Sequence, residues 1–173
     1  MIRVSKFNTF GDNPDKGFPD RGFISSIYNA NENGAKYVED RISYSRKGVL
    51  RGLHGDNQIG KLFIPIKGVF KFYAKGLLND DSVFFDSWSH ESGLAIYVPP
   101  NYINGHLCMS DEAIMMYKWT HNYNGPEHQF TVKYNDPDLG IDWGLDALPI
   151  VSRRDANGMS YKELKKQYEN RVW

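Results

Sequence analysis

Three side chains that can take part in acid–base or anion chemistry lie close together in the sequence. Arg51, His54 and Lys61 stand among glycines in a strand-like stretch, KGVLRGLHGDNQIGKL. Histidine exchanges protons near neutral pH, and the two cations can hold an anion. On a regular strand Arg51 and His54 would face opposite sides, but the glycine between them permits a bulge that re-aims one of them. Spacing alone favours a turn with surface charges and leaves a proton-transfer site as the alternative.

Other motifs of site chemistry are missing from the sequence. It contains no GxxxxGK[ST] phosphate loop, no GxGxxG fingerprint and no HExxH zinc helix. His121 and His128 are seven residues apart with no third ligand beside them. The neighbours of His54 are Gly55 and Asp56, whereas a metal site on a β-barrel would need two histidines on one strand plus a carboxylate. We therefore predict neither a metal nor another cofactor.

Short strands must position these residues. Sixteen glycines and eight prolines divide the chain into short runs, many of them rich in Val, Ile, Tyr and Phe. Four runs are typical of strands, and their spacing predicts a sandwich or small barrel. These runs are Lys61–Tyr73, Val83–Trp88, Leu94–Val98 and Ala113–Trp119.

The C-terminal segment SYKELKKQYENRVW predicts one helix. Ser160 and Glu163 form a capping-box pattern, and Leu164 and Tyr168 share a face. The chain shows no internal repeat, low-complexity tract or linker, so residues 1–173 are predicted to form a single domain. The expected architecture is mainly β with this one terminal helix.

Composition excludes several classes of protein. Twenty-one basic residues balance 21 acidic ones, which argues against nucleic acid or an anionic membrane as the partner. The lone Cys108 rules out an internal disulfide framework. No apolar run approaches the roughly 20 residues that span a bilayer, and the N-terminus lacks the apolar stretch of a secretory signal. We expect a cytoplasmic protein without membrane contact.

Six segments, taken in order, resemble one family of enzymes. The segments are DRGF (20–23), GVLRGLH with GKL (48–62), YVPPNY (97–102), YKWT with YN (117–124), NDPDLGIDW (135–143) and SRRD (152–155). Together they resemble the signatures of the dTDP-4-dehydrorhamnose 3,5-epimerase family, from about residue 18 to residue 158. Six segments in family order are far more specific than any one of them.

The resemblance implies a fold and a function. The fold would be a double-stranded β-helix of the cupin (jelly-roll) class, without a metal. The protein would be a homodimer, with an N-terminal strand exchanged between subunits. The substrate would be a nucleotide-diphosphate-linked 4-keto-6-deoxy sugar in the biosynthesis of surface-polysaccharide sugars, and the reaction would invert C3, C5 or both.

This chemistry requires a particular set of side chains. A proton on the carbon next to a ketone is acidic because the negative charge left on that carbon spreads onto the ketone oxygen, which forms an enolate. An epimerase therefore needs a base on one face of the sugar, an acid on the opposite face and positive charge at the enolate oxygen. The resemblance assigns His54 as the base and Asp155 as its hydrogen-bond acceptor. It assigns Tyr117 as the acid and Lys61 to the enolate oxygen. Judged without the resemblance, Tyr117 would be a core residue, Asp155 a turn residue and Lys61 a solvated lysine.

Five further residues are expected to bind the substrate. Arg51 would orient the sugar or phosphate, and Arg21 would hold the diphosphate. Phe23 belongs to the same N-terminal turn, and Tyr123 is a second candidate near the site. Asn104 stands where the family usually has a histidine, so an amide replaces a group that can titrate.

Other departures from the family pattern concern the pocket. His106 is not expected to point where the family histidine points. Lys71 and Ser26 replace acidic residues, and Arg41 replaces asparagine. Because such changes reverse or remove charge, a different sugar or nucleotide is expected, with a preference for the GDP-linked 4-keto heptoses of capsule pathways.

Two alternatives remain open at this point. The change at Asn104 suggests an enzyme that inverts only one carbon, C3, because a small displacement of the acid could spare one position and not the other. The other alternative is a cupin that binds sugar nucleotides without turning them over.

Overall fold

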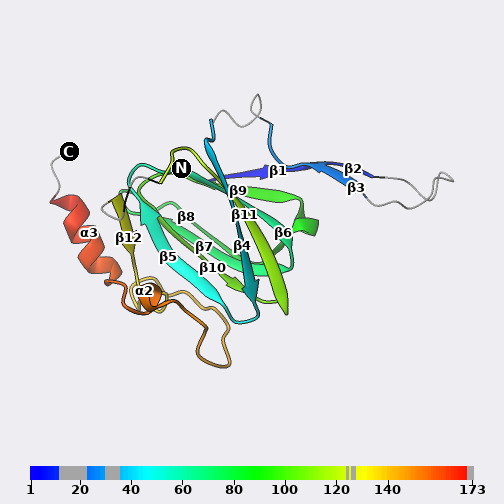
Figure 1. The fold of residues 1–173 in the computed structure, drawn as a ribbon. Coiled ribbons are helices and arrows are strands. Elements are labelled where there is room, and N and C mark those ends of the chain that lie inside the picture. The colour runs from blue at the N-terminus through cyan, green and yellow to red at the C-terminus, as the bar shows by residue number, and fades with distance from the viewer. Residues whose placement is uncertain (12–22, 30–35, 124, 126–127, 171–173) are drawn as a thin grey trace.

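Two antiparallel sheets of five strands each face one another and form the body of the protein (Figure 1). The computed structural model describes residues 1–11, 23–29, 36–123, 125 and 128–170. A two-stranded arm projects from this body, and helices follow the last strand. The prediction of a mainly β, cupin-type jelly roll with a short C-terminal helix is confirmed.

In the first sheet, the strand that carries Tyr117 lies between two other strands. In spatial order its strands are β1 (Arg3–Lys6), β9 (Leu94–Val98), β6 (Lys61–Lys67), β11 (Glu112–Trp119) and β4 (Glu39–Arg46). On β11, Tyr117 pairs with Phe63 of β6 on one side and with Arg41 of β4 on the other. Tyr117 therefore comes from an internal strand, which is held along both edges.

The second sheet carries the strand of His54. In spatial order its strands are β12 (Gln129–Thr131), β5 (Leu50–Asp56), β10 (Tyr102–Cys108), β7 (Val69–Gly76) and β8 (Ser82–Ser89). On β5, His54 pairs with Asn104 of β10 and with Thr131 of β12. His54 and Tyr117 thus belong to different sheets.

The strand predictions hold with one change. Three predicted runs lie within or coincide with β8, β9 and β11. The run Lys61–Tyr73 forms two strands, β6 and β7, because the chain turns at Gly68 with φ of 81°. A left-handed φ favours glycine, which has no Cβ to clash. The turn sends the two halves of the run into opposite sheets.

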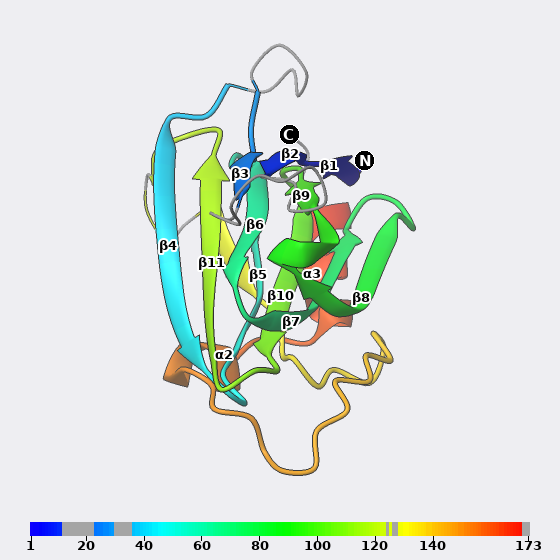
Figure 2. The same ribbon diagram turned by 90° about the vertical axis from the view of Figure 1, so that its right-hand side faces the viewer.

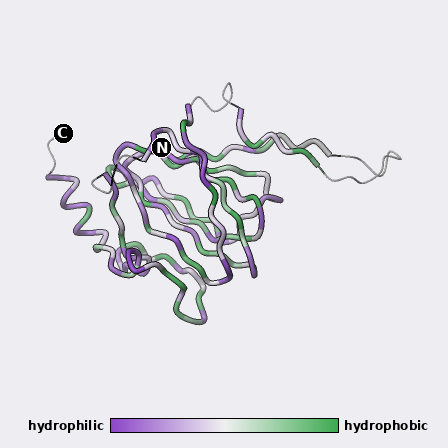
Figure 3. The backbone as a smooth tube through the Cα atoms, viewed as in Figure 1, coloured by the Kyte–Doolittle hydropathy of each residue, from purple (hydrophilic) through white to green (hydrophobic). Residues whose placement is uncertain are grey.

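Aromatic side chains fill the space between the sheets. Phe63 of the first sheet meets Phe72 of the second at a ring-centroid distance of 5.1 Å, and Phe72 meets Trp88 at 5.2 Å. All three are buried, and each buried large apolar side chain contributes about 1.5–3 kcal/mol. Figure 3 shows the matching alternation of hydrophobic and hydrophilic residues along the strands.

The predicted C-terminal helix exists and is docked on the sandwich. α3 (Tyr161–Glu169) follows its N-cap, Ser160, which forms the complete capping box with Glu163. Leu164 and Tyr168, predicted to share a face, are both buried, and the ring of Tyr168 lies 5.4 Å from that of Phe130 on β12. In the described part of the chain, no helix is both long enough and apolar enough to cross a membrane.

A short helix, α2 (Arg153–Ala156), lies at the end of a long connection from β12. This connection runs along one end of the sandwich in both views (Figures 1 and 2). Ser152 caps α2 by accepting a hydrogen bond from the backbone N–H of Asp155, at 3.1 Å. The cap fixes the backbone from which the Asp155 side chain enters the protein.

The projecting arm consists of β2 (Asn8–Gly11) and β3 (Phe23–Ser26). Phe23 stacks on His90, in the single turn η2 (His90–Ser92), with ring centroids 5.2 Å apart. Phe23 nevertheless remains 59% exposed. Arg21, predicted to hold the diphosphate, lies outside the described residues.

Candidate active site

A cavity of about 300 Å³ opens between the two sheets. The first sheet contributes Lys61 and Tyr117, the second contributes His54 and Asn104, and α2 contributes Asp155. The sandwich therefore gathers side chains from both of its layers around one space. Among the described residues, no three His, Cys, Asp or Glu side chains gather as they would around a metal ion.

A bulge between β5 and β10 brings Arg51 and His54 to the same cavity. Arg51 pairs with His106 and His54 with Asn104, so the strands shift register at this point. Gly52 has φ of 135°, and a Cβ there would lie 2.6 Å from the Cα of Gly105. Only glycine fits this close approach of two backbones. The bulge that the glycine permits is therefore present, in place of the turn that spacing alone favours.

His54 and Asp155 form a close pair. Nε2 of His54 donates to Oδ1 of Asp155 at 2.6 Å, and the backbone N–H of Gly52 donates to Oδ2 at 3.2 Å. Burial alone would raise the pKa of Asp155, but the hydrogen bonds from His54 and Gly52 lower it below its ordinary value. The carboxylate therefore stays charged and fixes the tautomer of the imidazole. Nδ1 is left as the ring nitrogen that can accept a proton.

Tyr117 reaches the cavity from the other sheet. Its Oη lies 2.7 Å from Oγ of Ser43 on β4 and 3.3 Å from Nε2 of His106 on β10. Burial raises the pKa of Tyr117 to about 12, although the hydrogen bond with Ser43 and the charge of Arg51 oppose the shift. The phenol is thus protonated at neutral pH and available as a proton donor.

Lys61 is a buried cation, not the solvated lysine that its sequence context suggests. Only 7% of the residue is exposed, and Nζ lies 5.3 Å from the ring centre of Trp119. Burial lowers the pKa of Lys61 to about 8, with Asp56 opposing the shift. The ammonium is charged at neutral pH and little hydrated, which strengthens its interaction with a nearby anion.

Arg51 and Asn104, both predicted to bind substrate, also line the cavity. Arg51 Nε donates to Oγ of Ser45 at 3.1 Å, and Nη2 donates to the carbonyl of Tyr44 at 2.8 Å. These bonds to β4 tie the guanidinium across the gap between the sheets. Asn104 is 6% exposed and stands next to His54 on the neighbouring strand.

A second cavity, of about 330 Å³, shares Arg41, His54, Lys61 and Trp119 with the first. Tyr123, the other predicted candidate, lines this second cavity together with Arg154. The guanidinium of Arg41 lies over the Trp119 ring, 4.0 Å from its centre. Two arginines, one of them over an aromatic ring, suit an anion attached to a flat group.

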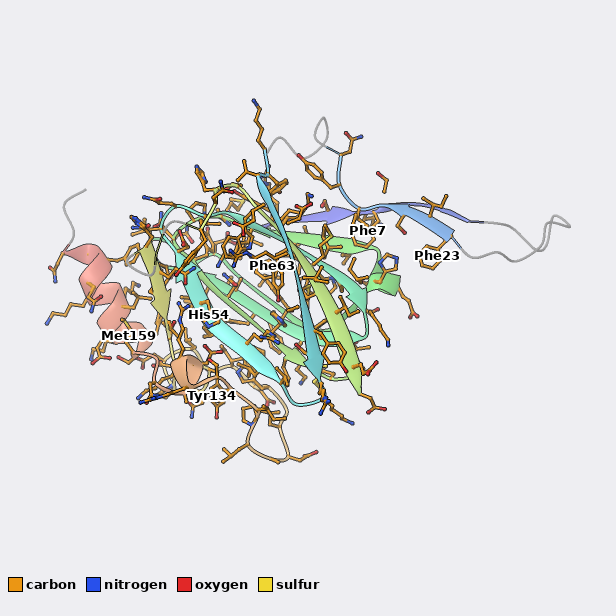
Figure 4. The ribbon with its side chains drawn as sticks, viewed as in Figure 1. Phe7, Phe23, His54, Phe63, Tyr134 and Met159 are labelled. Carbon is orange, nitrogen blue, oxygen red and sulfur yellow. The ribbon has the colours of Figure 1, made fainter. Side chains whose placement is uncertain are left out.

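The structure does not bring every predicted residue to this place. Phe23 lies on the arm, away from His54 and Phe63 in the body (Figure 4). Ser26 is on the same arm strand. Lys71 does not line either cavity, because its ammonium pairs with Asp86 of β8 at 2.6 Å. The charge change at Lys71 therefore gives no reason to expect a different substrate.

His106 is the main residue that sequence reasoning missed. Residues two apart on a strand share a face, so His106 enters the same cavity as Asn104. Strand alternation that starts from Asn104, instead of from Gly105, places His106 on the cavity face. His106 is 3% exposed, and burial lowers its pKa to about 3, helped by the charges of Arg51 and His54.

The fold and this cavity define a cupin-class protein with an acid–base site. Residues 6–163 match the protein family described as dTDP-4-dehydrorhamnose 3,5-epimerase. The chain belongs to this family and is an isomerase, as its motifs predict.

Named relatives support the same assignment. The dTDP-4-dehydrorhamnose 3,5-epimerase of Methanothermobacter thermautotrophicus is 33% identical over 165 residues, covering 87% of this chain and 88% of the relative. A solved dTDP-6-deoxy-D-glucose-3,5-epimerase of Legionella pneumophila, in complex with dTDP-4-keto-L-rhamnose, has a TM-score of 0.83 and 28% identity over 96% of this chain and 90% of its own. A dTDP-4-dehydrorhamnose 3,5-epimerase of Elizabethkingia anophelis has a TM-score of 0.79 and 30% identity, covering 94% and 92%.

Proposed function

We propose that the protein epimerises a nucleotide-diphosphate-linked 4-keto-6-deoxy sugar at C3, C5 or both. The observation that carries the proposal is the His54–Asp155 pair in one sheet layer and the protonated Tyr117 in the other. A sugar ring between the sheets would have a base on one face and an acid on the opposite face. Inversion of a carbon requires this arrangement.

His54 would take the proton from the carbon beside the ketone through Nδ1. The resulting imidazolium is stabilised by the charged Asp155, which already accepts the Nε2 hydrogen. Tyr117 would then donate its proton to the carbon from the other side. Because the phenol holds its proton at neutral pH, it does so only once a strongly basic carbanion is present.

Lys61 would stabilise the enolate oxygen. Its ammonium is buried at the cavity wall, where a charge interacts more strongly than it does in water. Arg51 and Asn104 would orient the sugar in the first cavity. The arginines of the second cavity suit the diphosphate, with Trp119 and Tyr123 available to the nucleoside.

Solvent-deuterium uptake tests the proposal. The protein is incubated in heavy water with a dTDP-4-keto-6-deoxyhexose and, separately, with a GDP-4-keto-6-deoxyheptose, and mass gain is followed. The relatives named above favour uptake with the dTDP sugar. One deuteron would indicate a single labile carbon, as the C3-only alternative requires, and two would indicate both. His54→Asn should abolish uptake, whereas the matched His121→Asn, at an exposed site outside both cavities, should not.

Absence of uptake with both substrates would refute this function. A protein that binds these nucleotides but never exchanges a proton would be a binding cupin. Uptake by the His54→Asn variant at the wild-type rate would refute the base assignment and leave the reaction class intact.

We also propose that the protein acts as a homodimer. The support is the arm of β2 and β3, which extends away from the body and exposes Phe23 and Ile24 by 59% and 76% (Figure 1). Covering these side chains with a second subunit would bury apolar surface and could bring Phe23 to the partner's pocket. Light scattering should give twice the chain mass of 19.9 kDa. A mass of one chain at micromolar concentration would contradict the proposal.

A further inference from the structure

His106 is a buried polar residue for which the acid–base scheme above has no task. It lies on β10 in the same sheet as His54, yet its Nε2 crosses the sandwich to within 3.3 Å of the Tyr117 hydroxyl. The rest of its ring is packed among aromatic side chains, with Phe70 at 5.5 Å and Phe63 at 6.5 Å between ring centres. Within the part of the chain that the structure describes, the hydrogen-bonding contact of this imidazole is with the hydroxyl of Tyr117, the proposed acid.

The ring is held in its neutral form. Only 3% of His106 is exposed, and Arg51, its pairing partner on β5, brings a positive charge to the same cavity. Both effects disfavour an imidazolium and lower the pKa of His106. A neutral imidazole carries one N–H and one lone pair, so Nε2 either donates to the phenol oxygen or accepts from it.

The requirement that Tyr117 acts as an acid decides between these two states. The phenol has a single hydrogen, and among the described residues Oη lies within hydrogen-bond distance of Ser43 and His106. If Nε2 accepted that hydrogen, the phenol O–H would point at His106 and away from the substrate. If Nε2 and the Ser43 hydroxyl both donate to Oη, the phenol hydrogen is free to point into the cavity.

We propose that His106 is a positioning residue, whose Nε2–H donates to the Tyr117 oxygen and directs the phenol proton at the substrate carbon. When that proton moves, the O–H bond breaks, a C–H bond forms and the electron pair stays on Oη. The phenolate then accepts hydrogen bonds from His106 and Ser43, and it regains a proton from water after release of the product. This inference rests on the proposed epimerase function.

A positioning role of His106 affects hydrogen exchange and inversion differently, whereas a purely structural role would change both together. Deprotonation by His54 does not need Tyr117. In heavy water the proton on the partly exposed His54 is replaced by a deuteron from the solvent, and a carbanion that takes this deuteron from His54 has exchanged hydrogen without inverting. Loss of the support from His106 should therefore lower inversion more than exchange. Deuterium uptake is read by mass, and inversion is read by NMR of the product sugar.

His106→Phe removes the donor and keeps a ring of similar size. We expect inversion to fall about 10- to 150-fold, the scale of losing a hydrogen bond to a charged oxygen, and the ratio of exchange to inversion to rise. His106→Gln keeps an N–H at similar reach and should recover inversion, whereas His106→Asn is one methylene shorter and should not. The Asn and Gln pair carries the test if the Phe variant fails to fold.

Phe70→Leu is the matched control, because Phe70 packs on His106 without lining the cavity. Loosening the core there should change exchange and inversion in parallel. An unchanged exchange-to-inversion ratio in His106→Phe, or equal ratios in the Gln and Asn variants, would overturn the inference while leaving the epimerase function in place. Absence of exchange by the wild-type protein would instead overturn the function and this inference together.

Discussion

The replacement Asp155→Asn tests the base most directly. Asp155 is 3% exposed and receives hydrogen bonds from His54 Nε2 at 2.6 Å and from the Gly52 backbone at 3.2 Å. Asparagine has almost the same shape, and its amide oxygen can still accept one of these bonds. The replacement removes the negative charge that stabilises the imidazolium formed when His54 takes a proton.

The size of the effect follows from the burial of the pair. A hydrogen bond to a charged group contributes about 1.5–3 kcal/mol, which corresponds to about 10- to 150-fold in rate. Little of this is lost to solvent screening, because the Asp155 side chain is only 4% exposed. We expect kcat for deuterium uptake to fall by this factor. KM should change little, because Asp155 acts through His54.

The assay compares initial rates of solvent-deuterium uptake at saturating substrate for wild type, Asp155→Asn and a control, Asp146→Asn. Asp146 is exposed in the connection that leads to α2. Circular dichroism and thermal unfolding establish that each variant is folded. A folded Asp155→Asn protein within twofold of the wild-type kcat would refute the assignment of a stabilising charge to Asp155.

Three more outcomes follow from the packing and charges. Burial lowers the pKa of Lys61 to about 8, so its side chain loses its positive charge as pH rises through that value. We therefore expect kcat to fall above pH 8, and a kcat that stays constant up to pH 9.5 would contradict the role of Lys61 at the enolate. Gly52→Ala places a Cβ 2.6 Å from the Gly105 Cα at a φ of 135° and should cost at least about 2 kcal/mol of unfolding free energy. Calorimetry should show this as a lower Tm, and an unchanged Tm would mean that the bulge tolerates a side chain. Leu164→Ala opens a void under α3, where Leu164 is 2% exposed. Denaturant titration should show that the free energy of unfolding falls by about 2–5 kcal/mol, and a loss below about 1 kcal/mol would mean that the docking of α3 does not depend on this side chain.

Several features could be read from the sequence because they depend on neighbours along the chain. The capping box at Ser160 and Glu163 involves residues three apart, and the burial of Leu164 and Tyr168 follows from helical periodicity. The strands β8, β9 and β11 follow from short β-branched and aromatic runs bounded by turn residues. The bulge at Gly52 was predictable as a possibility, since a glycine separates Arg51 from Leu53 and His54.

The assembly of the site depends on contacts that local patterns do not encode. His54 and Asp155 are 101 residues apart and meet only because α2 packs against β5. Lys61 has the sequence context of a surface lysine but is buried beside Trp119. Their tasks were assigned from family resemblance, because spacing along the chain does not reveal distance across a sandwich.

The sequence by itself determined the family, the mainly β composition and the residue types available for acid–base chemistry. Only the tertiary structure decided which of them share a cavity: it placed Phe23 on the projecting arm, Lys71 against Asp86, and His106 beside Tyr117. The physical reason is that each strand presents alternate residues to the cavity, while register and the pairing of distant strands determine which residues face one another there.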